Sequence, residues 1–118
     1  TWINKILGGY FIILKYDIQI PNRDIIVNLK RITNQVYKLL PSREEGADWE
    51  KPLLTLIEEL SGMERLFIGQ YDILFSLLCK LEGLFPLTTE EDFFLYRRTI
   101  FECLNLVKII RDEIECQD

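Results

Sequence analysis

The sequence predicts an all-α protein, a compact bundle of four to five helices in which the two C-terminal helices form a central antiparallel pair. Apolar residues recur at intervals of three and four over most of the chain. Proline, glycine and residues that favour helix N-caps separate these periodic segments. With 118 residues, of which 48% are hydrophobic, the chain is large enough for one core and too small for two. We therefore expect residues 1–118 to form a single all-α domain, and the absence of an initiator methionine indicates a domain excised from a longer protein.

The first segment carries two competing patterns. Residues 2–16 have helical spacing of apolar side chains, although Gly8 and Gly9 weaken it. Residues 14–20 also alternate between apolar and polar side chains, which is typical of a strand. Helix and strand both remain open here, and Pro21 ends the segment in either case.

Residues 22–40 have the clearest amphipathic pattern and predict a second helix that Pro41 ends. After a charged loop, Asp48 is a suitable N-cap for a short third helix that ends near Leu60. The polar side of the second helix forms a basic strip, which consists of Arg23, Lys30, Arg31 and Lys38.

Two capping-box patterns predict where the last two helices begin. Ser61 with Glu64 places the start of a fourth helix at about residue 62, and Thr88 with Glu91 precedes a fifth helix that extends to about residue 115. The fourth helix is apolar on most sides, so we expect neighbouring elements to enclose it. The fifth helix has an apolar seam made of Phe93, Tyr96, Ile100, Cys103, Val107, Ile110 and Ile114.

The composition excludes several kinds of chemistry. The chain has no histidine, which excludes Ser-His-Asp and Cys-His catalysis and the common Cys/His zinc sites. Its three cysteines, Cys79, Cys103 and Cys116, are odd in number and far apart, so we expect reduced thiols and an intracellular location, cytoplasmic or nuclear. The longest uncharged N-terminal run is too short to span a membrane. We expect no metal, no cofactor and no membrane association.

The fifth helix has more apolar residues than its seam requires. Phe94 and Phe101 lie off the seam, seven residues apart, and Arg97, Arg98 and Lys108 lie around them. Aromatic residues and arginine are enriched where binding energy concentrates, so these five residues predict a face that binds another protein or a second copy of the chain. The alternative is that the first and third helices cover this face within one monomer.

The charge distribution suggests a second kind of partner. Residues 1–43 contain seven basic and two acidic residues, whereas the whole chain has a net charge of -5. The basic strip could therefore bind nucleic-acid phosphates, but no exposed aromatic residue is expected beside it for base stacking. An acidic protein surface fits the strip better.

Carboxylate pairs raise a third alternative, a magnesium-dependent all-α nucleotide hydrolase. Glu45 and Asp48 have the spacing of one acidic pair, but the second pair is missing, because Ser61 stands three residues after Glu58 and Gly62 three after Glu59. We therefore expect no catalytic residues. The sequence is best interpreted as a non-catalytic protein-interaction or assembly module, with nucleic-acid binding as the main alternative.

Overall fold

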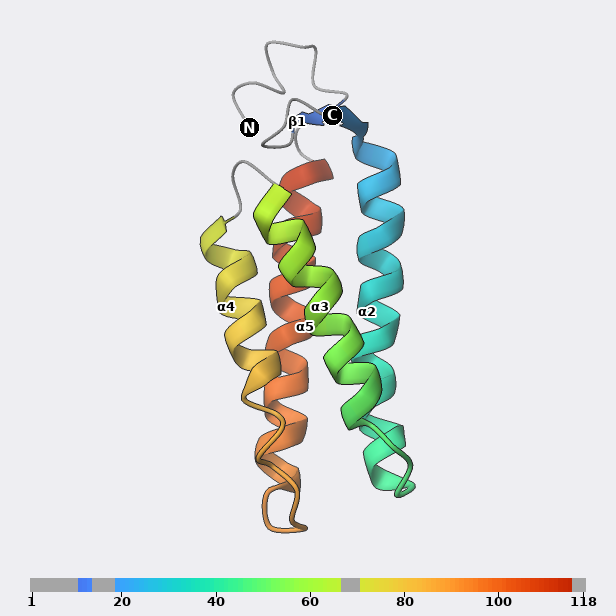
Figure 1. Cartoon of the computed structure of the whole chain (residues 1–118), viewed down its shortest axis with the longest axis vertical. Helices are drawn as coiled ribbons and strands as arrows, with labels where there is room; N and C mark the ends of the chain where they lie inside the picture. Colours follow the sequence, from blue (N-terminus) through green and yellow to red (C-terminus); the bar gives the residue numbers. More distant parts are fainter. Residues whose placement is uncertain (1–10, 14–18, 67–70, 116–118) are drawn as a thin grey trace.

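In the part of the chain that the structure describes, four helices run alternately up and down the long axis (Figure 1). The structure is a computed structural model, and it describes residues 11–13, 19–66 and 71–115. The helices are α2 (Asn22–Glu44), α3 (Glu50–Leu66), α4 (Tyr71–Glu82) and α5 (Phe93–Glu115), and two short strands, β1 (Phe11–Ile13) and β2 (Gln19–Pro21), precede them.

Each helix contributes one apolar stripe to a shared core. Helix α5 packs against α2 on one side and α4 on the other, and α3 completes the bundle between α2 and α4. The prediction of an all-α bundle with an antiparallel C-terminal pair is confirmed. The largest side chains that are fully buried in this core are Tyr96, Leu29, Ile32, Leu39, Leu53, Leu60, Leu74, Leu77, Leu81 and Leu84.

The segment before α2 contains an antiparallel strand pair. Phe11 pairs with Pro21, and Ile13 pairs with Gln19. Of the two alternatives left open for residues 14–20, the strand is therefore found at residues 19 and 20, and the helical interpretation of residues 2–16 is wrong for residues 11–13. Pro21 fits at a strand end because it lacks the N–H group that a strand interior requires. Residues 1–10 and 14–18 lie outside the described part of the chain.

Helix α2 does not end at Pro41, as the sequence predicted, but continues to Glu44. Pro41 cannot donate a backbone hydrogen bond, yet its carbonyl accepts one from Glu45 at 2.9 Å, so the helix passes through it. Gly46, two residues after the last helical residue, terminates α2, because its φ of 76° is the left-handed conformation that glycine adopts most easily. The amides of Gly46 and Ala47 then close a Schellman motif onto the carbonyls of Arg43 and Ser42.

The predicted boundary at Ser61 is also wrong, because α3 runs without a break to Leu66. The apolar spacing continues through this position: Leu60 is fully buried and Met63 packs against the core. Burial of this stripe keeps the backbone helical and overrides the local capping pattern. The fourth helix consequently begins at Tyr71 instead of residue 62.

The second capping box is present, but one residue later than predicted. The Asp92 amide donates to the Thr89 hydroxyl at 3.3 Å, and the Thr89 amide donates to the Asp92 carboxylate at 3.4 Å. This reciprocal pair satisfies two amides before α5 begins. Thr88 instead donates its amide to the Pro86 carbonyl in the preceding turn.

Helix α4 is not enclosed on most sides, in contrast to the expectation. Its buried stripe consists of leucines, but the Phe75 side chain is 52% exposed and Cys79 is also exposed. The reason is the position of α4 at a corner of the bundle, where it packs against α3 and α5. Within the described residues, none of the helices combines the length and the apolarity that crossing a membrane requires.

Candidate interaction surfaces

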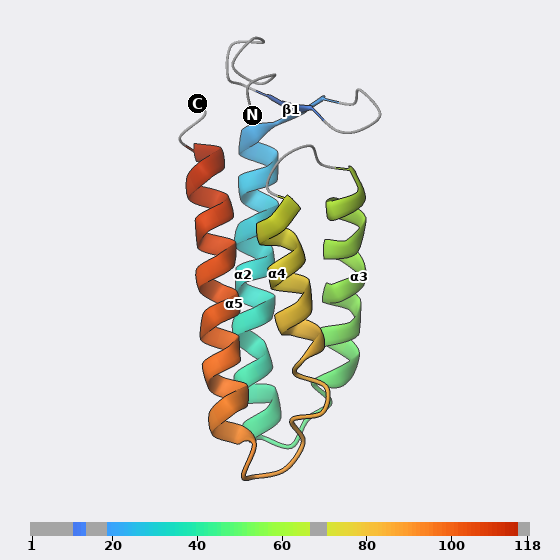
Figure 2. The ribbon, with the colours of Figure 1, turned by 90° about the vertical axis from the view of Figure 1, so that its left-hand side faces the viewer.

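Helix α5 divides into a buried face and an exposed apolar face. The predicted seam is confirmed, since it is fully buried from Tyr96 to Ile114 and Phe93 packs at its edge. On the outward side, Phe94 is 74% exposed and Phe101 is 44% exposed. Figure 2 shows α5 at one edge of the bundle, and its packing contacts are with α2 and α4.

The outward face of α5 brings together all five residues that the sequence proposed for it. The helical spacing of Phe94, Arg97, Arg98, Phe101 and Lys108 places them within one stripe, and both aromatic residues and all three cations are exposed. The Arg97 guanidinium lies over the Phe101 ring, 5.1 Å from its centroid. This contact holds a cation and an aromatic side chain in a fixed arrangement at the surface.

Two aliphatic residues extend this face. Leu95 and Ile109 are also exposed, although the sequence analysis did not include them among the binding residues. Their position off the buried seam was the signal that could have found them. The four exposed apolar side chains define what we call the α5 face, which consists of Phe94, Leu95, Phe101 and Ile109.

The basic strip on α2 is less uniform than the sequence indicated. Arg23, Lys30 and Lys38 are exposed, and Arg23 makes only a 3.9 Å contact with the neighbouring Asp24. Arg31 instead donates to a Glu59 carboxylate oxygen on α3 at 2.7 Å, which compensates its charge. Three of the four cations therefore remain for a partner.

An exposed aromatic residue does lie on the outer side of α2, in contrast to the expectation. Tyr37 is 56% exposed. It stands seven residues after Lys30 and directly before Lys38, so the helix places it beside the strip. Its seven-residue spacing from Lys30 was the signal that could have found it.

Arg43 has a role that the sequence analysis did not anticipate, because its position after Pro41 resembled a loop. Its guanidinium donates hydrogen bonds to the carbonyls of Leu87 and Thr89 at 2.8 and 2.7 Å. It also lies over the rings of Phe93 and Tyr96, at 5.2 and 4.8 Å from their centroids. Arg43 thus joins the end of α2 to the α4–α5 loop and is a structural residue.

Two ionisable groups are sealed in the core. The Tyr96 hydroxyl donates to the Leu39 carbonyl at 3.3 Å, and burial raises the pKa of Tyr96 although the nearby Arg43 opposes the change. Burial also raises the pKa of the Cys103 thiol to about 12, against the effect of Lys80. A thiol with this pKa stays protonated and unreactive at neutral pH.

Two of the carboxylates considered for the nucleotide-hydrolase alternative, Asp48 and Glu59, have other roles. Asp48 accepts the amides of Glu50 and Lys51 at 3.1 and 3.2 Å, which confirms it as the N-cap of α3. Glu59 is engaged by Arg31. Across residues 11–13, 19–66 and 71–115, no three Cys, Asp or Glu side chains lie close enough together to hold a metal ion.

Comparison with protein-family models, with curated proteins and with solved structures finds no match for this chain. The case for a function therefore depends on its own surfaces.

Proposed function

We propose that this protein is a non-catalytic interaction or assembly module that binds another protein, or a second copy of itself, through the α5 face. The observation that carries the proposal is the exposure of Phe94 and Phe101, which stand seven residues apart on one side of a helix whose other side is fully buried. Exposed aliphatic residues that occur singly need no explanation, but a row of large apolar side chains does.

The composition of the α5 face supports this proposal. Burial of a phenylalanine side chain removes about 150–250 Å² from water, so two of them can supply the centre of a small interface. The contact between Arg97 and Phe101 already fixes two side chains, which reduces the entropy lost on binding. Arg98 and Lys108 would form a polar rim, and the basic strip on α2 would orient an acidic partner.

The reduced cysteines are consistent with an intracellular location for such a module. Cys79 and Cys103 are free thiols in the described part of the chain, and Cys103 is buried where an oxidant has no access.

The test is to substitute the two aromatic anchors. We expect a double variant, Phe94→Ala with Phe101→Ala, to lose binding. If the partner is a second copy, concentration-dependent self-association in analytical ultracentrifugation should disappear. If the partner is another protein, the variant should no longer recover a cross-linked partner from cell extract. The melting temperature should change little, because both side chains are exposed.

Leu54→Ala is the matched control, because Leu54 is an exposed large apolar residue on α3. It should leave association unchanged. A monomer whose Phe94 and Phe101 variants lose stability and no partner would contradict the proposal.

Nucleic-acid binding is the second candidate, and the exposed Tyr37 beside Lys30 and Lys38 favours it. It predicts binding to single-stranded DNA or RNA that weakens steeply with salt and drops when Tyr37 and Lys30 become alanine. No binding at low salt would remove this candidate.

A further inference from the structure

The groove between α2 and α3 is built differently in its two halves. Toward the C-terminal end of α3, polar side chains bridge it: Arg31 donates to both Asn28 Oδ1 and Glu59 Oε2, at 2.7 Å in each case. The Asn28 amide also contacts the sulfur of Met63 at 3.8 Å. This half of the groove is therefore closed by contacts between the two helices.

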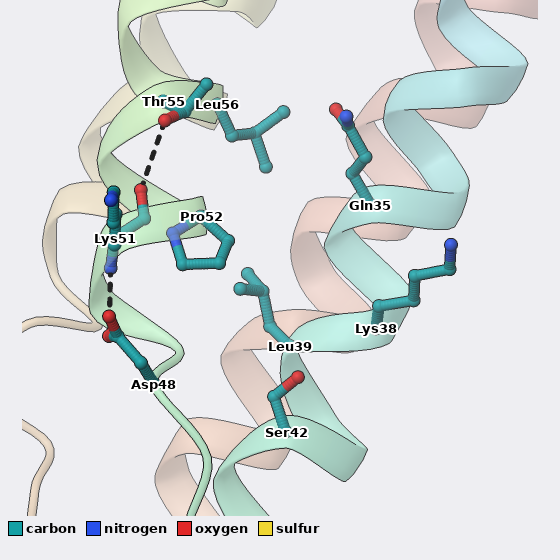
Figure 3. Close-up of a pocket in the computed structure, with 9 residues that line it drawn as sticks. All are labelled: Gln35, Lys38, Leu39, Ser42, Asp48, Lys51, Pro52, Thr55 and Leu56. Carbon is teal, nitrogen blue, oxygen red and sulfur yellow. Dashed lines mark hydrogen bonds between the residues drawn. The ribbon is translucent and has the colours of Figure 1, made fainter.

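The other half is open and forms a cleft of about 530 Å³ (Figure 3). Leu39 and Leu56 form its apolar floor, and each is only 2% exposed. The volume lies within the range of sites that bind small ligands or peptide side chains. The cleft is lined by Gln35, Lys38, Leu39, Ser42, Asp48, Lys51, Pro52, Thr55 and Leu56.

One polar atom in this cleft lacks a partner. The Gln35 side chain extends from α2 toward Leu56 on α3 (Figure 3), and its buried Oε1 accepts no hydrogen bond within the protein. The Thr55 hydroxyl, which also lines the cleft, donates to the Lys51 carbonyl of its own helix. A buried acceptor without a donor costs free energy, which is recovered if the Gln35 amide turns toward a ligand that supplies a donor.

The start of α3 does not supply the missing donor or an anion site. The amides of Glu50 and Lys51 donate to Asp48, and Leu53 donates to the Trp49 carbonyl. Pro52 has no N–H group. The cationic groups at the cleft are the side chains of Lys38 and Lys51, and one acid, Asp48, stands against them.

We propose that this cleft is a second interaction site, which binds an acidic, amphipathic peptide segment of a protein partner. An apolar side chain of the segment packs on Leu39 and Leu56, and the Gln35 amide turns outward so that its Oε1 accepts an N–H donor of the segment. The carboxylates of the segment face Lys38 and Lys51. This site extends the proposed interaction function and does not depend on the α5 face.

Charge complementarity along α2 favours a peptide over a small molecule. The cations Lys38, Lys30 and Arg23 follow one another along the helix, and at 1.5 Å per residue they extend over roughly 22 Å of its length. The exposed Val27 lies among them. A ligand that fills only the cleft reaches one end of this row, whereas an extended or helical acidic segment follows all of it.

The experiment is selection of a random peptide library against the full chain, followed by affinity measurement on the enriched peptides. We expect peptides in which Asp or Glu flank a leucine or phenylalanine. Reversing both cleft charges with Lys38→Glu and Lys51→Glu should weaken binding at least about tenfold, the effect of losing 1.4 kcal/mol. Thr55→Phe, which fills the cleft from an exposed position, should weaken it similarly.

Arg111→Glu is the matched control, because it reverses a charge on α5 outside both proposed sites and should leave peptide affinity unchanged. Enriched peptides without acidic residues, or peptides that bind the Thr55→Phe variant as tightly as the original chain, would overturn the proposal. Displacement of the peptide by a single-stranded oligonucleotide that needs the same two lysines would also overturn it, in favour of a phosphate-binding strip. The Phe94 and Phe101 variants should bind these peptides normally, so the two sites fail independently.

Discussion

In this bundle, the position of a residue decides its contacts more than its amino-acid type does. Arg31 and Arg43 both lie on α2 and both are arginines, yet Arg31 bridges to α3 and Arg43 bridges to the α4–α5 loop. Neither is available to a partner in the way that Arg23 is. A count of basic residues therefore overestimates the charge that the surface of α2 presents.

The role of Arg43 yields a prediction at this scale. Arg43→Met keeps much of the apolar side chain but removes the hydrogen bonds to Leu87 and Thr89 and the contacts with two aromatic rings. Hydrogen bonds from a charged donor contribute about 1.5–3 kcal/mol each. In the variant, water can reach the loop and hydrogen-bond the freed carbonyls, which offsets part of the lost free energy. We expect the free energy of unfolding in urea to fall by about 2 kcal/mol.

Arg23→Met is the control, since Arg23 is highly exposed. It should change the free energy of unfolding by less than about 0.5 kcal/mol. Equal effects of the two substitutions would mean that the Arg43 contacts do not stabilise the fold.

The helices were predictable where burial and local signals agree. Helix α5 combines a long apolar seam with a capping box, and its extent was correct to within a few residues. The errors arose where the two disagree. At Ser61 the buried stripe continues through a capping pattern, and at Pro41 the helix continues because the glycine that ends it lies five residues further on.

The predictability of the candidate site follows the same logic. The residues of the α5 face could be found because their spacing separates them from the seam of the same helix. The cleft could not be found, because it depends on which residues of α3 lie opposite Gln35 and Lys38 on α2. The spacing of apolar residues along the sequence does not show which residues of two packed helices lie opposite each other.

Two glycines provide a prediction at the scale of the element. Gly46 ends α2 with a φ of 76°, whereas Gly62 lies within α3, and an added Cβ meets no atom within 4 Å at either position. Gly46→Ala should lower the free energy of unfolding by about 1 kcal/mol, because alanine is strained in the left-handed conformation. Gly62→Ala should raise it by about 0.5–1 kcal/mol, because alanine favours the helix.

Urea unfolding of both variants checks this pair, and each serves as the control for the other. The space around both positions is open, so a difference in sign isolates the backbone conformation from packing. Destabilisation by Gly62→Ala would indicate that α3 is interrupted at Ser61 after all.

At the scale of the whole molecule, the core determines how stability changes at alkaline pH. The pKa values of Tyr96 and Cys103 are both raised by burial, that of Cys103 from an ordinary value of 9.0 to about 12. In the unfolded chain these groups have their ordinary pKa values, 9.0 for the cysteine and 10.0 for the tyrosine. Well below pH 9 both groups are protonated in both states, so neither makes stability depend on pH. As the pH rises through these values, the unfolded chain releases the protons while the folded chain retains them.

The unfolded state then binds fewer protons than the folded state, and the free energy of unfolding must fall as the pH rises. The expected slope approaches about 1.4 kcal/mol per pH unit for each group that is ionised only in the unfolded chain. Urea unfolding at several pH values between about 8 and 11 measures this slope. Cys103→Ala and Tyr96→Phe should each reduce it, although each variant is less stable at neutral pH because a buried contact is lost.

Leu54→Ala is the control, since it truncates an exposed side chain that has no ionisable group, and it should leave the alkaline slope unchanged. If the Cys103 and Tyr96 variants retain the full slope, other groups cause the loss of stability. A reduced slope would show that the same close packing that holds the four helices together also keeps both groups protonated, so that alkaline pH weakens the bundle through its core.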